Sequence, residues 1–159
     1  MLHRFQHYLL FPLSICVTLS VGLIAGFFTA SNIQTWYHGL TRPSLTPPNW
    51  VFAPTWTILY MLLGVVLYKL ITAHKTANII QARKLFFLQL LLNFLWSFIF
   101  FNFHLTLIAF VDILFLIVVV FRLMYILKDT HRQITFILVP YIAWLCFAAY
   151  LNFGVLLLN

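Results

Sequence analysis

The side chains in this chain with the clearest potential for chemistry are polar and aromatic residues that recur at helical spacing. They are Gln89, Asn93, Trp96, Ser97 and Phe100. Separations of three and four residues place them along one face of a helix, and the rest of that segment is mostly Leu, Phe and Ile. This face indicates either hydrogen bonds between packed helices or a surface that contacts a ligand, and the two interpretations are compatible.

Two further apolar segments carry aromatic side chains on one face. In the first, Trp56 and Tyr60 are one helical turn apart. In the second, the aromatic face begins at Pro140, which has no backbone N–H to donate. A helix that is kinked there can line a cavity. The members of that face are Tyr141, Trp144, Ala148 and Asn152. Trp and Tyr also anchor helices at membrane interfaces, but Trp56, Trp96 and Trp144 lie deeper in their segments, where an interfacial role explains them less well.

Ionisable residues are few, and Asp112 is the only acidic residue inside an apolar segment. A carboxylate inside a membrane span is commonly part of a functional site. We favour a structural role instead, in which Asp112 accepts hydrogen bonds from loop backbone or pairs with Arg42. The six His residues have no ligand spacing, and Cys16 and Cys146 are isolated in different segments. We therefore expect no metal, disulfide or cofactor, and no general-base or nucleophile constellation of an ordinary enzyme.

Membrane-spanning helices must position these faces, because the composition cannot build a water-soluble surface. Hydrophobic residues make up 64% and charged residues 7% of the 159 residues, and the mean hydropathy is +1.05. A spanning helix needs about 20 apolar residues. Five runs reach that length, at residues 9–30, 51–73, 85–103, 105–127 and 134–158. We predict a single membrane domain over residues 1–159, an all-α bundle of five transmembrane helices.

The basic residues set the predicted orientation of these spans. Those at or near one side of the membrane are Arg4, Lys69, Lys75, Arg83, Lys84, Arg122, Lys128 and Arg132, which leaves Arg42 on the other. The positive-inside rule then puts the N-terminus in the cytoplasm and the C-terminus on the opposite side. The net charge of +7 is mostly a topology signal. Nucleic acid is not an expected partner, because the chain lacks a soluble basic face.

The stretch between the first two spans, residues 31–50, is predicted to be an ordered loop that forms a lid. Pro43, Pro47 and Pro48 restrict its backbone, and its aromatic and leucine side chains can fold back on the helices. In the first span, Gly22 and Gly26 form a GxxxG pattern that permits close helix approach. Packing within one bundle is our first interpretation of that pattern, and a contact between two chains is the alternative.

Five segments carry a recognisable pattern in a fixed order. They are WYHGLTRPSLTPPNW (36–50), VFAPTWTILY (51–60), LNFLWSFIFF (92–101), VD (111–112) and PYIAWLCFAAYLN (140–152). Together they resemble the TspO/MBR family, which is the translocator protein or tryptophan-rich sensory protein family, also called the peripheral-type benzodiazepine receptor family. The resemblance covers nearly the whole chain.

The resemblance implies a five-helix bundle with a pocket under the first loop, commonly in a homodimer. Its ligands would be porphyrins, sterols and drugs of the benzodiazepine or isoquinoline type. Members are described as sensors, as transporters, and as catalysts of light- and oxygen-dependent porphyrin breakdown that uses pocket tryptophans, here Trp56 and Trp144. The ligand-binding residues implied by motif are Trp50, Trp56, Tyr60, Asn93, Trp96, Tyr141, Trp144, Cys146, Phe147 and Ala148.

A porphyrin suits such a pocket, because its flat ring can stack on Trp and Tyr while its carboxylates reach Arg42 or His38 near the loop, where Trp36 also lies. Two departures from the family pattern stand out. Leu45 replaces a common loop tryptophan, and no basic residue follows Tyr150, so the C-terminal cholesterol motif is incomplete. We expect a membrane receptor or sensor for porphyrins, with a porphyrin-degrading protein or a porphyrin or sterol transporter as alternatives.

Overall fold

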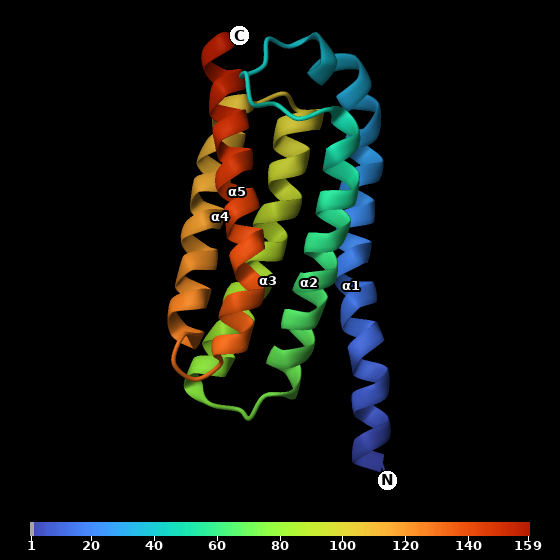
Figure 1. The fold of residues 1–159 in the computed structure, drawn as a ribbon, viewed down its shortest axis with the longest axis vertical. Helices are drawn as coiled ribbons and strands as arrows, with labels where there is room; N and C mark the ends of the chain where they lie inside the picture. The colour runs from blue at the N-terminus through green and yellow to red at the C-terminus, as the bar shows by residue number, and fades with distance from the viewer. Residues whose placement is uncertain (1) are drawn as a thin grey trace.

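The described chain folds into five long helices joined by short connections (Figure 1). The computed structural model describes residues 2–159, with side chains described from Leu9 onward. The helices are α1 (Leu2–Asn32), α2 (Phe52–Thr72), α3 (Ala77–Ser97), α4 (Thr106–Leu127) and α5 (Arg132–Leu158). Each contributes a stretch that is long and apolar enough to cross a membrane. The predicted all-α membrane fold with five spans is confirmed.

The helices form one bundle in which sequence neighbours run antiparallel (Figure 1). α1 packs mainly on α2, α3 and α5 both pack on α4, and α2 also contacts α5. α1 stands at one side, and its N-terminal end extends past the other helices (Figure 1). It is also the least buried span, with 17% of its most apolar stretch inside the protein. α1 therefore forms an outer wall rather than part of the centre.

The first helix is longer than predicted. The predicted span ends at residue 30, whereas α1 continues to Asn32 and passes into a π-helical turn, η1 (Ile33–Tyr37). A second π-helical turn, η3 (Phe98–Asn102), extends α3 and contacts η1. Polar residues after position 30 mark where the chain leaves the apolar zone, but they do not interrupt the helical hydrogen bonds, which continue to Gly39. The loop before α2 is correspondingly shorter than residues 31–50.

The turn between α2 and α3 is fixed by side chains at both helix ends. The Oγ1 atom of Thr76 accepts a hydrogen bond from the backbone N–H of Ile79 at 3.2 Å and so caps α3. Arg83 donates to the carbonyl oxygens of Leu70 and Ile71 at 3.0 and 3.1 Å. These carbonyls end α2 and have no partner within the helix, so Arg83 satisfies them.

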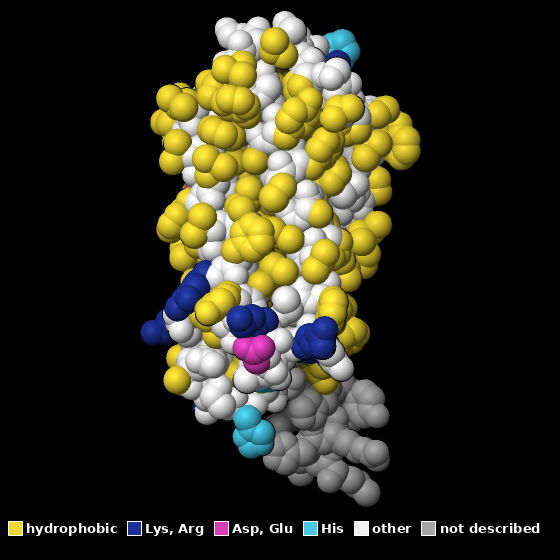
Figure 2. All heavy atoms as spheres, turned by 60° about the vertical axis from the view of Figure 1, so that its left-hand side comes forward, with side chains coloured by type: hydrophobic (Ala, Val, Ile, Leu, Met, Phe, Trp, Pro, Cys, Tyr) yellow, Lys and Arg dark blue, Asp and Glu magenta, His cyan; other side chains and the backbone are white. Residues whose placement is uncertain are grey.

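The surface of the bundle is apolar over most of its length. Figure 2 shows a broad yellow band of hydrophobic side chains, with Lys and Arg in dark blue gathered toward the end that carries the α4–α5 turn. Many of these side chains are large and well exposed, as Phe27 and Val118 are. An apolar surface of this extent is costly in water and suits contact with lipid.

Candidate functional site

A large cavity lies at the end of the bundle where the α1–α2 connection crosses between helices. Its volume is about 990 Å³, and it is walled by α1, α2, α5 and the end of α3 with η3. Its lining is almost wholly apolar, and none of the residues that line it is charged. Small-molecule sites have volumes of about 300–1,000 Å³, so this cavity is large enough for a bulky hydrophobic ligand.

Aromatic side chains from three helices meet on the cavity wall. The ring centroid of Trp56 lies 6.2 Å from that of Trp96 and 6.3 Å from that of Trp144. Tyr60, one turn further along α2, lies 5.8 Å from Trp56, and Phe100 stacks on Trp96 at 5.8 Å. Aromatic pairs attract one another at these separations. The structure thus brings together the aromatic faces of α2, α3 and α5.

The indole N–H groups of two wall tryptophans differ in their partners. Nε1 of Trp96 donates to Oδ1 of Asn152 at 3.1 Å, and Nδ2 of Asn152 donates to the carbonyl oxygen of Thr106 at 2.9 Å. This chain of contacts fixes the Trp96 ring between α3, α5 and α4. Nε1 of Trp144 is buried and has no hydrogen-bond partner among the residues that the structure describes. Because an unpaired buried donor is costly, Trp144 is ready to donate to an acceptor on a ligand.

Next to the cavity, four polar side chains form a hydrogen-bonded chain through the bundle interior. Tyr60 Oη donates to Asn93 Oδ1 at 2.6 Å, and Asn93 Nδ2 donates to Tyr141 Oη at 2.9 Å. Tyr141 Oη donates in turn to Gln89 Oε1 at 2.6 Å. All four residues are buried. The stripe on α3 therefore has two roles, since Gln89 and Asn93 link helices whereas Trp96 lines the cavity.

α1 contributes a wall of small and aliphatic residues. A Cβ atom at Gly22 would overlap the ring of Tyr60, so this glycine lets α1 approach α2 closely. Gly26 lines the cavity and faces open space. The GxxxG pattern thus serves packing within the bundle at Gly22 and cavity volume at Gly26. Leu23 and Phe27 also line the cavity while being 72% and 79% exposed, so the cavity opens sideways past α1 toward the lipid-facing surface.

The connection over the cavity, residues 40–48, is tied to the C-terminal end of α5. The backbone N–H of Thr41 donates to Oδ1 of Asn159, and Nδ2 of Asn159 donates to the carbonyl oxygen of Thr41, both at 3.0 Å. The ring of Pro43 lies against Gly154, where a Cβ atom would not fit. Figure 1 shows the connection running from α1 across to α5 and back to α2, so it covers this end of the bundle.

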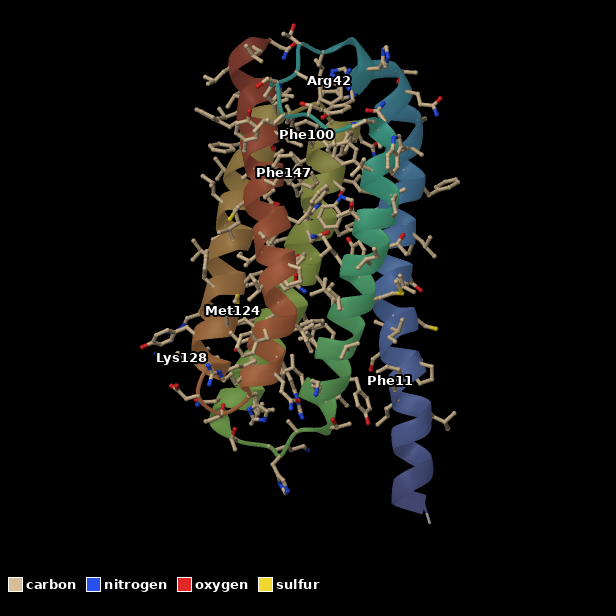
Figure 3. All side chains as sticks on the ribbon, in the orientation of Figure 1. Phe11, Arg42, Phe100, Met124, Lys128 and Phe147 are labelled. Carbon is tan, nitrogen blue, oxygen red and sulfur yellow. The ribbon has the colours of Figure 1, made fainter. Side chains whose placement is uncertain are left out.

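Arg42 and Trp36 lie near the cavity without lining it. The Arg42 guanidinium lies 5.6 Å from the ring centroid of Tyr37, and Nη1 donates to Oδ1 of Asn49 at 3.3 Å. Tyr37 and Asn49 both line the cavity, so Arg42 is one side chain away from it; Figure 3 shows Arg42 beneath the connection and Phe100 further into the bundle. Trp36 stacks on His104 at 4.1 Å, which ties the end of α1 to the turn before α4.

The predicted ligand-binding residues fall into three groups. On the cavity wall lie Trp56, Tyr60, Trp96, Trp144 and Ala148. Beside or behind the wall lie Trp36, Arg42, Asn93 and Tyr141. Away from it, Trp50 is 74% exposed, Cys146 is exposed, and Phe147 lines a separate groove between α2 and α5 together with Pro140.

Several wall residues were not predicted from the sequence. They include Leu19, Ala25 and Thr29 on α1, with Phe52 and Phe101. For Phe52 a signal existed, because Phe52, Trp56 and Tyr60 recur every four residues along α2. For α1 the only signal was the GxxxG pattern, which does not distinguish a packing surface from a cavity wall.

Asp112 does not pair with Arg42, so that predicted contact is wrong. The physical reason is their placement, since α4 packs on α3 and α5 while Arg42 is held by Asn49 just before α2. Oδ2 of Asp112 is buried, and no described residue forms a hydrogen bond with it. Among the described residues, no three His, Cys, Asp or Glu side chains are grouped so that they could hold a metal ion.

Comparison with known proteins gives matches along the whole bundle. The sequence profile of the TspO/MBR family matches residues 14–158. The chain is 44% identical over 147 residues to the tryptophan-rich protein TspO of Archaeoglobus fulgidus. This alignment covers 92% of this chain and 94% of that protein. It is 32% identical over 126 residues to the tryptophan-rich sensory protein of Cereibacter sphaeroides, covering 78% and 77% of the two chains. It is also 32% identical over 123 residues to the translocator protein of Homo sapiens, covering 76% and 72%.

Proposed function

The chain belongs to the TspO/MBR family, and from this premise we propose that it is a membrane receptor or sensor for porphyrins and related hydrophobic ligands. Drugs of the benzodiazepine or isoquinoline type would use the same site. The observation that carries the proposal is the apolar cavity with Trp56, Trp96 and Trp144 on its wall. The names of two relatives, a sensory protein and a translocator protein, agree with a role in ligand handling.

A bound porphyrin would be held by stacking and by contacts at its edge. Its flat ring would lie against the tryptophan faces, which already attract aromatic partners. The unpaired Nε1 of Trp144 would donate to an acceptor on the ligand. No described cationic residue lines the cavity, so the porphyrin carboxylates would lie under the connection, near Arg42. There Arg42 can give up its hydrogen bond to Asn49 and donate to a carboxylate instead, which is a stronger, charge-assisted contact.

A titration of the purified protein with a dicarboxylic porphyrin, followed by tryptophan fluorescence, tests this function. We expect Trp144→Phe to weaken binding about three- to tenfold, since it removes one hydrogen bond and part of a ring. Trp50→Phe is the matched control, because Trp50 is exposed and outside the cavity. Unchanged affinity in Trp144→Phe, or an equal loss in both variants, would move the binding site elsewhere.

The tryptophans on the cavity wall also support a second candidate activity, which is the light- and oxygen-dependent breakdown of bound porphyrin. Trp56 and Trp144 would both lie next to the ligand ring, where they can take part in photochemistry. We expect Trp56→Phe and Trp144→Phe each to slow the light-driven loss of porphyrin absorbance while the fold stays intact. Turnover in darkness would indicate an enzyme, and rates equal to the unmodified protein would remove the role of both tryptophans.

The proposed setting is a membrane with the N-terminus in the cytoplasm and the C-terminus on the other side. The gathering of Lys and Arg at the end opposite the cavity supports this orientation (Figure 2). A homodimer is part of the proposal on the strength of family resemblance, and a sterol is a weaker candidate ligand than a porphyrin. Porphyrin flux into sealed vesicles that contain the protein would indicate a transporter instead.

A further inference from the structure

Two cations share one exposed aromatic ring at the end of α4 opposite the cavity. The Arg122 guanidinium carbon lies 5.7 Å from the ring centroid of Tyr125, and Nζ of Lys128 lies 4.3 Å from the same centroid. All three side chains are exposed. Lys128 lies on the outer side of this end in Figure 3, and Figure 2 shows that Lys and Arg gather there.

Arg122 lies inside the apolar part of α4. It precedes Leu127, the last residue of the helix, by five residues, which is about 8 Å of helix. Its exposed neighbours Val118 and Phe121 belong to the lipid-facing surface. An arginine does not lose its charge in a protein, and placing that charge beside lipid is costly unless it reaches an anion.

The described part of the chain pairs no carboxylate with Arg122 or Lys128. Among the side chains that the structure describes, Arg122 and Lys128 form no ion pair, and their contacts are with Tyr125. Asp129 follows Lys128 in sequence without pairing with it, and Asp112 lies ten residues before Arg122, about 15 Å away along α4. Both cations are therefore open to an anion from outside the chain.

The other basic residues at this end do not share a ring with a second cation in the described part of the chain: the Arg132 guanidinium carbon, for example, lies 5.4 Å from the ring centroid of Phe136. Lys69 donates to Oε1 of Gln133 at 2.8 Å, and Arg83 caps α2 through backbone carbonyl oxygens. Lys75 lies in the α2–α3 turn and Lys84 lies on α3, and both are exposed, but no contact links either of them to Tyr125 in the described part of the chain. In the described part of the chain, the placement of two cations over one tyrosine ring is particular to α4.

We propose that Arg122, Tyr125 and Lys128 form a binding site for the headgroup phosphate of an anionic phospholipid. The guanidinium can bind two phosphate oxygens in its planar fork, and the lysine adds a point charge on the other side of the ring. The tyrosine hydroxyl group is a further donor at the interface. The acyl chains would then lie along the exposed apolar face of α4 that includes Val118 and Phe121. This site is independent of the cavity and of its ligand.

Spin-label spectroscopy in phosphatidylcholine vesicles tests the site directly. The unmodified protein is reconstituted with trace spin-labelled phosphatidylglycerol or phosphatidylcholine, and the immobilised fraction of each lipid is measured. We expect at least about fivefold preference for phosphatidylglycerol, in line with the attraction of one or two cations near the surface. Arg122→Gln combined with Lys128→Gln should bring the preference close to one. No preference in the unmodified protein would overturn the proposal.

A double variant of equal charge serves as the matched control. Lys75→Gln combined with Lys84→Gln removes the same charge from the same end and should keep most of the preference. An equal loss in both double variants would overturn the proposal in favour of diffuse attraction. Inorganic phosphate is compared with chloride at equal ionic strength, and a specific loss with phosphate would assign the site to the free ion instead. Unchanged porphyrin binding in the test variant shows that it is folded.

Discussion

At the scale of single residues, the polar groups on the cavity wall differ in their hydrogen bonding. Two have a partner within the protein, and one has none among the described residues. Tyr60 and Trp96 are held in position by hydrogen bonds to Asn93 and Asn152, so their rings are fixed within the bundle itself. Trp144 presents a buried N–H without a partner. Rings that are already fixed lower the entropy cost of binding a ligand. A buried donor without a partner would increase the affinity for a ligand whose acceptor can reach it.

Arg42 is predicted to recognise the carboxylates of a porphyrin. Arg42→Ala should weaken binding of a dicarboxylic porphyrin about tenfold, since it removes a charge-assisted hydrogen bond. Affinities are measured by fluorescence titration. The control is the dimethyl ester of the same porphyrin, whose affinity should not change because it carries no charge. Equal affinity of the free acid for both proteins would show that the carboxylates lie elsewhere.

The buried hydrogen-bonded chain is predicted to stabilise the bundle and to hold Tyr60 against the cavity. Asn93→Leu should lower the free energy of unfolding by about 1–3 kcal/mol, because it leaves the Tyr60 hydroxyl group buried without a partner. Adding Tyr60→Phe removes that hydroxyl group and should recover part of the loss. Thermal unfolding in detergent measures both variants, and fully additive losses would show that the two side chains are not coupled.

At the scale of elements, α1 differs from the other spans. It packs mainly on α2, and much of its surface faces lipid or the cavity. Small residues keep its backbone close to Tyr60 in one place and leave space in another. Since the cavity opens past Leu23 and Phe27, a hydrophobic ligand can reach it from the bilayer without passing the loop.

Gly26 is predicted to set the volume of the cavity. Gly26→Leu should fill part of the space and weaken porphyrin binding at least tenfold, because the new side chain meets open space and not a packed neighbour. Stability should hold or rise, since Gly is about 1 kcal/mol less favourable than Ala or Leu in a helix. Gly39→Leu is the matched control, as Gly39 also faces open space but does not line the cavity. Equal titration curves for Gly26→Leu and the unmodified protein would exclude Gly26 from the binding surface.

At the scale of the whole molecule, the two ends of the bundle have opposite character. One end holds the aromatic cavity and a connection that is tied to α5 through Asn159. The other holds most of the basic side chains and the turns fixed by Arg83 and Thr76. The cavity and the basic end are therefore separated by the length of the helices, so each can change without disturbing the other.

The end that holds the cavity is predicted to lie outside the cytoplasm. A single cysteine at Ser44 should react with a membrane-impermeant maleimide added to intact cells, whereas one at Lys75 should react only after the cells are opened. Both positions are exposed, and the background carries Cys16→Ala and Cys146→Ala. The reverse pattern of labelling would invert the orientation derived from the basic residues.

The membrane fold, the number of spans and the aromatic faces of α2, α3 and α5 could all be predicted from the amino-acid sequence. Those features depend on hydropathy and on helical periodicity, which are local properties of the chain. Three features became visible only in the folded bundle: Asn93 and Tyr141 bind each other behind the wall, Trp50 faces outward, and α1 helps to line the cavity. Which helices meet, and which side of a residue faces a partner, depends on packing between segments far apart in sequence, so no local pattern contains it.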